Sequence, residues 1–221
     1  MAYSLPADIA QRPVAIDSTG TLGRRIAAVY VAGGSDVRLF DASPEQRKAA
    51  RRYVEENIAE VQHALDLRPD RIGQVEVASE RSQAVNGAWL VIEAVPERID
   101  VKTAVFGELD EAAEPDAILA TNSSSLPSRL IIDNVQHPER VLNMHYYRLP
   151  EMNVVELPGR RVLRRPLALA PSQQAPQLRI WRMRRALLLE FRRINGHPRS
   201  GVSIGATTGI RNGVVVHVGP L

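Results

Sequence analysis

The sequence predicts an α/β domain built on a Rossmann-like, doubly wound and mainly parallel sheet, followed by an atypical C-terminal tail. Short apolar runs alternate with segments of helical periodicity from residue 14 to about residue 157. Glycines interrupt the first strand-to-helix turn at Gly20 and Gly23. Alternating strands and helices predict this class because parallel strands are joined by helices that cover both faces of the sheet.

The first strand and helix form a candidate dinucleotide-binding unit. Val14 to Ile16 is a β-branched strand pattern, and an amphipathic helix is expected over residues 21–32. At such a turn, backbone N–H groups at the helix N-terminus receive a pyrophosphate. Gly20 would let the backbone approach the phosphates, and Gly23 would let the helix pack closely on the strand. The candidate contacts are Ser18, Gly20, Thr21, Leu22 and Gly23.

Two features of this turn are unusual for a dinucleotide site. Ser18 stands where the first glycine of G-x-G-x-x-G is expected, and Asp17 adds a negative charge near the expected anion. We expect both to weaken binding, and an ordinary βα turn is the alternative. Asp41, however, closes a second predicted strand, residues 36–41, about 20 residues beyond the glycines. An acid there binds ribose hydroxyls and favours NAD over NADP, although it could instead cap the next helix.

The remaining predicted elements continue the alternation. A charged helix is expected over residues 44–67, and its basic residues are interpreted as a solvated face. A continuous apolar run at residues 88–93 indicates a strand that is buried on both faces. The other expected elements are a short strand at 74–78, a helix at 97–113, and strands at 117–121, 141–145 and 153–157.

Composition limits the classes of function. The 44% hydrophobic content supports a packed core, and the absence of cysteine excludes disulfides, thiolate catalysis and zinc sites built on Cys. We expect no metal site. No stretch approaches 18 consecutive apolar residues, and no basic region precedes an apolar one at the N-terminus. We therefore expect a soluble, unexported protein, cytoplasmic by default, with no membrane span.

The charge is divided unevenly along the chain. Residues 159–221 hold 12 of the 28 basic residues, all of them Arg, and a single acid, Glu190. Residues 1–158 are consequently acidic, so the net charge of +3 describes neither part. We expect two regions: a dinucleotide-binding domain over residues 1–158, and an Arg-rich, poorly ordered tail over residues 159–221.

Polar residues follow the ends of several predicted strands, where ligands of open parallel sheets bind. These are the segments Glu93 to Glu97 and Thr121 to Ser125, followed by His145 and Glu156. Two strands folded back between His145 and Glu156 could bring the imidazole to the carboxylate, which would fix its tautomer and make it a better base. A structural histidine and a helix-capping serine run are the alternatives.

Three segments resemble 3-hydroxyacyl-CoA dehydrogenases over residues 12–158. They are Val91-Ile-Glu-Ala-Val-Pro-Glu97, Ala120-Thr-Asn-Ser-Ser-Ser-Leu126 and His137-Pro-Glu-Arg-Val-Leu-Asn-Met-His-Tyr-Tyr147. The resemblance implies an NAD-binding Rossmann domain, normally followed by a helical domain that supplies the dimer contact and much of the acyl-CoA site. It also implies oxidation of an L-3-hydroxyacyl-CoA to the 3-ketoacyl-CoA, as in fatty acid metabolism, with hydride passing to NAD.

The resemblance also assigns roles to individual residues. His145 matches the catalytic base, Glu156 the glutamate that orients it, and Ser124 the serine that hydrogen-bonds the substrate oxygen. Further residues match positions near the nicotinamide and its ribose, namely Glu97, Lys102 and Asn122. Gly20, Gly23 and Asp41 match the dinucleotide fingerprint.

The sequence departs from the family pattern after Pro158. Residues 159–221 do not resemble the helical domain, and Arg without Lys is typical of a GC-rich coding region read out of frame. We expect a truncated product that has lost the dimer contact and has negligible turnover, or a catalytically inactive NAD-binding module. A basic arm for nucleic acid or acidic membranes is the rival interpretation, but such an arm would normally mix Lys with Arg.

Overall fold

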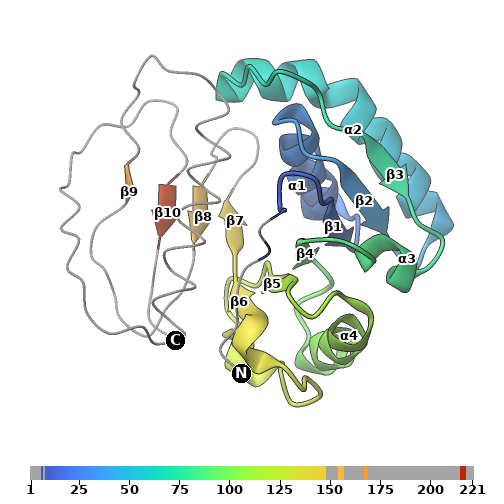
Figure 1. The fold of residues 1–221 in the computed structure, drawn as a ribbon, viewed down its shortest axis with the longest axis vertical. Helices are drawn as coiled ribbons and strands as arrows, with labels where there is room; N and C mark the ends of the chain where they lie inside the picture. Colours follow the sequence, from blue (N-terminus) through green and yellow to red (C-terminus); the bar gives the residue numbers. More distant parts are fainter. Residues whose placement is uncertain (1–5, 7, 148–153, 157–166, 169–214, 218–221) are drawn as a thin grey trace.

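The computed structural model describes residues 6, 8–147, 154–156, 167–168 and 215–217, the last three segments through their backbone pairing. Six parallel strands form the main sheet in the order β3-β2-β1-β4-β5-β6 (Figure 1). The strands are β1 (Val14–Asp17), β2 (Val37–Phe40), β3 (Val75–Val77), β4 (Leu90–Glu93), β5 (Ile118–Thr121) and β6 (Val141–Asn143). This order confirms the predicted Rossmann-like, doubly wound sheet.

Helices cover both faces of this sheet (Figure 1). The helices are α1 (Thr21–Ala32), α2 (Pro44–Leu65), α3 (Arg81–Val85) and α4 (Ile99–Ala112), with 3₁₀ turns at Ser128–Leu130 and Pro138–Arg140. Side chains alternate along β1, so Val14 and Ile16 join the core beneath α1 and α2, whereas Ala15 joins the core beneath α4. Every residue of β1, β4 and β5 is buried, as expected for central parallel strands.

Local signals account for the ends of the long helices. Helix α2 begins after Ser43, whose hydroxyl oxygen accepts a hydrogen bond from the backbone N–H of Gln46, and Pro44 occupies the first helical position. Helix α1 ends at Gly33, whose N–H bonds the carbonyl of Val29. Helix α3 was not predicted, because five residues are too few to display a helical period.

One predicted strand is wrong. The run at residues 141–145 is not a single strand: β6 ends at Asn143, and His145 begins β7 (His145–Tyr147) in a second sheet. The second sheet has the order β7-β8-β10-β9, with β8 (Val154–Glu156), β9 (Leu167–Ala168) and β10 (Val215–His217). The predicted 153–157 strand is therefore present as β8, which pairs with β7 antiparallel.

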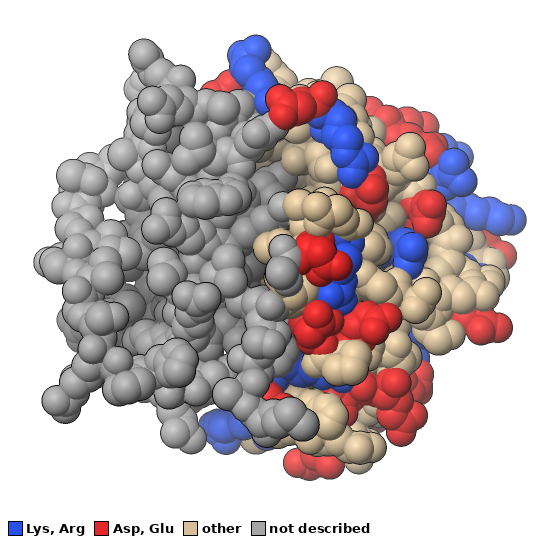
Figure 2. Space-filling model, viewed as in Figure 1, with Lys and Arg blue, Asp and Glu red and all other residues tan. Residues whose placement is uncertain are grey.

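Most of the predicted Arg-rich tail lies outside the described residues, so its poor order stays a prediction. From this region the structure describes only β9 and β10, with β10 pairing parallel to β8. In the described part, positive and negative side chains are interspersed over the visible face (Figure 2). None of the helices there combines the length and apolar composition that crossing a bilayer requires.

Candidate functional site

The carboxyl ends of β1, β2, β4 and β5 meet at one edge of the sheet, because all six strands are parallel. Strand β1 has β2 on one side and β4 on the other, so the strand order reverses there. In open α/β sheets a crevice opens at such a reversal, outside the strand ends, and ligands bind in it. The predicted contacts of residues 18–23, Asp41, Glu97 and Asn122 all follow strands that end at this edge.

The turn between β1 and α1 is as tight as the glycine pattern predicts. A Cβ at Gly23 would lie 2.0 Å from the carbonyl oxygen of Ser18, so no larger residue fits there without moving the turn. A Cβ at Gly20 would meet nothing within 4 Å, so this residue borders open space. Ser18 adopts φ 74°, the left-handed conformation that glycine accepts most easily. The chain therefore makes the dinucleotide-type turn with a serine in place of the first glycine.

The N-terminus of α1 has hydrogen-bond donors available. Its N-cap, Gly20, offers no side chain, and no acidic residue lies in the first turn. The first N–H groups of a helix lack intrahelical partners, so Thr21, Leu22 and Gly23 present their amides at this end. Asp41 bonds the turn that leads into this helix and is partly exposed: its Oδ2 accepts the Thr19 N–H at 2.7 Å and its Oδ1 accepts the Ser43 N–H at 3.0 Å. Asp41 thus joins the two turns that end β1 and β2.

Asp17 lies on the other face of the sheet from α1. It is 2% exposed, and its Oδ2 accepts a hydrogen bond from Nε of Arg81 at 2.9 Å. Burial raises the pKa of Asp17 to about 6, although the Arg81 guanidinium opposes the rise. The Arg81 side chain also pairs with Glu108 and lies 5.1 Å from the centre of the Phe40 ring. Arg81 therefore compensates the negative charge of Asp17. The sequence had suggested that this charge would weaken anion binding at the β1–α1 turn, but it had not foreseen the Arg81 partner.

A buried ion pair lies where β4 ends. Glu93 is fully buried and Lys102 is 1% exposed, and Nζ of Lys102 donates to Oε1 of Glu93 at 2.7 Å. The carboxylate has two further donors, the Val95 N–H at 2.6 Å and the Thr121 hydroxyl at 2.7 Å. Glu93 thus bonds at once to its own loop, to α4 and to the end of β5.

Glu97 continues this network toward solvent. Its Oε2 lies 3.3 Å from Nζ of Lys102, and its Oε1 accepts the hydroxyls of Ser123 and, at 2.8 Å, Ser125. Burial would raise the pKa of Glu97, but the serine hydroxyl bonds and the nearby Lys102 ammonium hold it below its usual range. Two of the predicted cofactor contacts, Glu97 and Lys102, are therefore in direct contact.

Asn122 joins the end of β5 to β7, because its side-chain oxygen accepts the Tyr146 N–H at 2.9 Å. Met144 and Tyr146 are buried in the core beneath α1. Side chains alternate along a strand, so His145, between them, projects to the opposite side, and it is only partly buried. Asn143 projects to that same side and bonds the loop that carries Ser124.

The backbone register pairs the two residues of the predicted dyad. In the antiparallel pair β7–β8, His145 lies directly opposite Glu156. Directly opposite residues of an antiparallel pair share a face of the sheet. The Glu156 side chain lies outside the described residues. Ser124 is exposed, two residues beyond Asn122.

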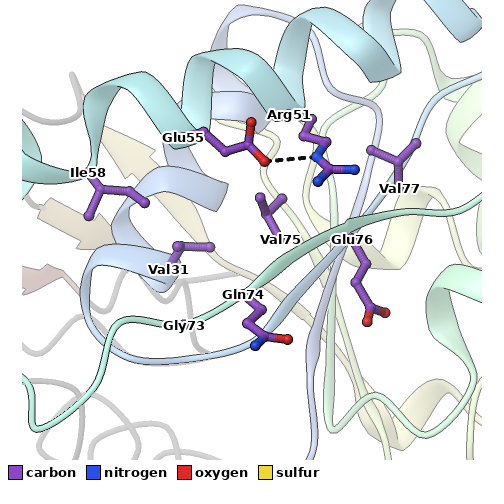
Figure 3. A pocket seen from close by; sticks show the side chains of 9 residues that line it. All are labelled: Val31, Arg51, Glu55, Ile58, Gly73, Gln74, Val75, Glu76 and Val77. Atoms are coloured by element: carbon purple, nitrogen blue, oxygen red, sulfur yellow. Dashed lines mark hydrogen bonds and ion pairs between the residues drawn. The ribbon is translucent and has the colours of Figure 1, made fainter.

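A hollow of about 640 Å³ lies elsewhere, beside the edge strand β3 and beneath α2 (Figure 3). Its lining includes Val31 of α1 and Gly73 just before β3, and Arg51 pairs with Glu55 at 2.8 Å along its α2 side. None of the predicted site residues lines it. This hollow therefore lies apart from the residues at the strand ends that carry the predicted site.

Comparison with known proteins identifies the family of this domain. Residues 13–161 match the family model described as the NAD-binding domain of 3-hydroxyacyl-CoA dehydrogenase. The chain belongs to the 3-hydroxyacyl-CoA dehydrogenase family. The family resemblance, the dinucleotide fold and NAD as cofactor are thereby confirmed.

The relatives of this dehydrogenase-family chain are longer proteins. It is 34% identical over 144 residues to 5-formyl-3-hydroxy-2-methylpyridine 4-carboxylate 5-dehydrogenase of Mesorhizobium japonicum, covering 64% of this chain and 46% of that protein. It is 34% identical over 155 residues to 3-hydroxyadipyl-CoA dehydrogenase of Escherichia coli, covering 65% and 31%. A crystal structure of a 5-formyl-3-hydroxy-2-methylpyridine 4-carboxylic acid 5-dehydrogenase, described as an NAD+-dependent dismutase, superimposes with TM-score 0.62 at 29% identity. The match covers 82% of this chain and 55% of that one. The chain thus spans about half or less of the length of these curated relatives.

Sequence reasoning about this dehydrogenase-family site missed three partners. Glu93 and Thr121 were placed at strand ends, but Glu93 was not recognised as the partner of Lys102, nor Thr121 as a partner of Glu93. The Asp17–Arg81 pair was not foreseen. The first had a signal, because Lys102 occupies the buried stripe of α4 together with Val105, Phe106 and Leu109. A lysine in such a stripe predicts a buried carboxylate partner. The Asp17 pair had none, since its partner is 64 residues away.

Proposed function

We propose that residues 12–158 bind NAD where the strand order reverses, at the carboxyl ends of β1 and β4. We propose also that they present the catalytic groups of an alcohol-oxidising site for an L-3-hydroxyacyl-CoA. The observation that carries the catalytic part is the antiparallel register that sets His145 opposite Glu156. Membership of the dehydrogenase family supports the reaction class. The relatives named 3-hydroxyadipyl-CoA and 3-hydroxybutyryl-CoA dehydrogenase support a CoA thioester of a 3-hydroxy acid as the substrate class.

The residues at the strand ends fit a dinucleotide. The first-turn amides of α1 and the open space at Gly20 suit a pyrophosphate. The partly exposed Asp41 carboxylate suits the adenosine ribose hydroxyls and disfavours the extra phosphate of NADP. Glu97, Lys102 and Asn122 follow β4 and β5, so we assign them to the nicotinamide half of the cofactor.

When bound, NAD supplies the hydride acceptor. The proposed step removes a proton and a hydride from one H–C–O–H unit. His145 takes the hydroxyl proton on one ring nitrogen, and Glu156 holds the proton on the other, which fixes the tautomer and stabilises the imidazolium that forms. Ser124 donates a hydrogen bond to the same substrate oxygen as it becomes a carbonyl.

We further propose that the chain by itself turns over 3-hydroxyacyl-CoA negligibly. The family's helical domain positions the acyl group, and residues 159–221 do not resemble it. Misplacement of reacting groups by ~1 Å can cost ~100-fold in rate. The family's dimer contact, which belongs to the same helical domain, is proposed to be lost as well.

A chimaera tests this proposal. The helical domain of a related dehydrogenase is joined after Leu157, and NADH formation from an L-3-hydroxyacyl-CoA is followed by absorbance. We expect activity in the chimaera, at least ~100-fold less after His145→Ala, and unchanged activity after the matched change His137→Ala at an exposed histidine. A chimaera that binds NAD but gives no NADH would support an inactive NAD-binding module. Robust turnover by the unmodified chain, abolished by His145→Ala, would make residues 159–221 a substrate domain.

A further inference from the structure

The buried carboxylate of Glu93 has more partners than a simple ion pair needs. It accepts hydrogen bonds from Lys102, from the Val95 N–H and from the Thr121 hydroxyl, at distances between 2.6 and 3.1 Å. Thr121 in turn accepts the Ser123 N–H at 3.2 Å. Glu93 is therefore the common acceptor for the loop after β4, the first turns of α4 and the loop after β5.

A charge pair this deeply buried is an expensive way to stabilise a fold. Two charges lose favourable hydration when they are buried, and apolar side chains of similar volume in their place are often as stabilising or more so. Stability alone therefore does not explain why Glu93 and Lys102 stand here. The pair is also part of a longer chain of contacts. Lys102 reaches Glu97 at 3.3 Å, and Glu97 accepts the hydroxyls of Ser123 and Ser125 from the neighbouring loop.

We propose that Glu93 is a positioning residue for the nicotinamide half of the cofactor. In a sheet of order 3-2-1-4-5-6, one mononucleotide lies over the β1–β2 ends and the other over the β4–β5 ends. Glu93 touches none of the proposed cofactor contacts after β1 and β2. It bonds Lys102 directly, and Lys102 in turn contacts Glu97. Through Thr121 it also holds the loop that carries Asn122. It acts through these residues, because its own carboxylate is fully buried. This inference rests on the proposed assignment of Glu97, Lys102 and Asn122.

The experiment compares NAD with ADP, which has the adenosine and phosphates but no second nucleoside. Calorimetry on the full chain gives both affinities for the parent and for Glu93→Gln, which keeps the side chain's size. We expect NAD binding to weaken about tenfold, while ADP binding stays within about twofold. Equal loss of NAD and ADP affinity, or no loss of either, would overturn the proposal.

A matched control separates positioning from general destabilisation. Asp110 and Arg140 form another ion pair on this face, at 2.7 Å, and both side chains are buried, at 3% and 1% exposed. Arg140 precedes β6, so this pair lies at the amino ends of the strands, away from the site. Asp110→Asn should lower stability and leave the ratio of NAD to ADP affinity unchanged. A change in that ratio as large as in Glu93→Gln would refute a specific role for Glu93.

Hydrogen exchange provides a readout that does not depend on NAD. In Glu93→Gln, amides in residues 94–98 and 122–127 should exchange faster, while those of the β1–α1 turn keep the parent rate. Should Glu93→Gln fail to fold, Thr121→Val removes one branch of the network and should loosen residues 122–127 alone. Unchanged exchange in these loops would contradict the inference. A parent chain that does not bind NAD would instead refute the proposed function and leave the exchange test valid.

Discussion

The buried carboxyl of Asp17 gives the protein a stability that should fall as the pH rises. Asp17 is 2% exposed, and burial raises its pKa from the ordinary 3.8 to about 6 despite the Arg81 guanidinium at 2.9 Å. The native state thus binds a proton that the unfolded chain has already released between these two values. A carboxyl with a raised pKa contributes stability that is fully present below pH 3.8 and is lost as pH rises through about 6.

The size of this effect follows from the gap between the two pKa values. A gap of roughly two units corresponds to about 3 kcal/mol of unfolding free energy at about 1.4 kcal/mol per unit. Asp17→Asn replaces the carboxyl with a neutral amide of similar size, which does not titrate. The unfolding free energy of the parent minus that of Asp17→Asn should therefore fall by about 2.4 kcal/mol between pH 4 and pH 7, because the unfolded carboxyl is still partly protonated at pH 4.

Urea denaturation at several pH values, followed by far-UV circular dichroism, measures this difference. Asp36→Asn is the control of opposite sign, because hydrogen bonds from the Arg71 guanidinium lower the pKa of Asp36. The stability that Asp36 contributes is present above its ordinary pKa and lost as the pH falls, so that difference should rise with pH. A flat or rising difference for Asp17→Asn would refute the reasoning.

Three further substitutions test the turn and the core. Ser18→Gly removes the strain of φ 74° and should raise the unfolding free energy by about 0.5–1 kcal/mol, measured by urea denaturation; it should also tighten NAD binding by calorimetry, and equal affinity would show that turn geometry is not limiting. Gly23→Ala places a Cβ 2.0 Å from the Ser18 carbonyl oxygen and should cost at least about 3 kcal/mol in the same assay, unlike Gly20→Ala, which meets open space. Tyr30→Phe removes the 2.7 Å hydroxyl contact with the buried Tyr146 and should cost about 1–2 kcal/mol by thermal unfolding; an unchanged midpoint would contradict that.

The sequence predicted the elements whose signals are local. Helix α1 matched its expected bounds because Gly20 and Gly33 mark its ends, and Gly23 proved to have the close packing that the glycine pattern requires. Asp41 was correctly expected at the end of β2, since strand length and spacing along the chain determine that position. These features depend on neighbouring residues, which a sequence displays directly.

Features that depend on distant partners could not be predicted in the same way. The apolar run at residues 141–145 does not reveal that the chain changes sheets at Met144, because that depends on pairing with β5 and β8. The neutralisation of Asp17 depends on Arg81, which is remote in sequence. The His145–Glu156 pairing was inferred from a turn between two short strands, and the backbone register agrees with it, but the roles of both residues stay a prediction.

The bond from Asn122 to the backbone of Tyr146 has a consequence for how β7 can fold. A strand of three residues specifies its register weakly, and a slip by one residue would turn His145 into the core and Tyr146 out of it. The Met144 N–H bonds the Thr121 carbonyl at 2.8 Å, and the Tyr146 N–H bonds the Asn122 side chain at 2.9 Å. The chain is therefore held to the end of β5 at two alternate amides, one just before β7 and one within it. These two bonds to the end of β5 therefore favour one of the two possible facings of His145 without any contribution from β8.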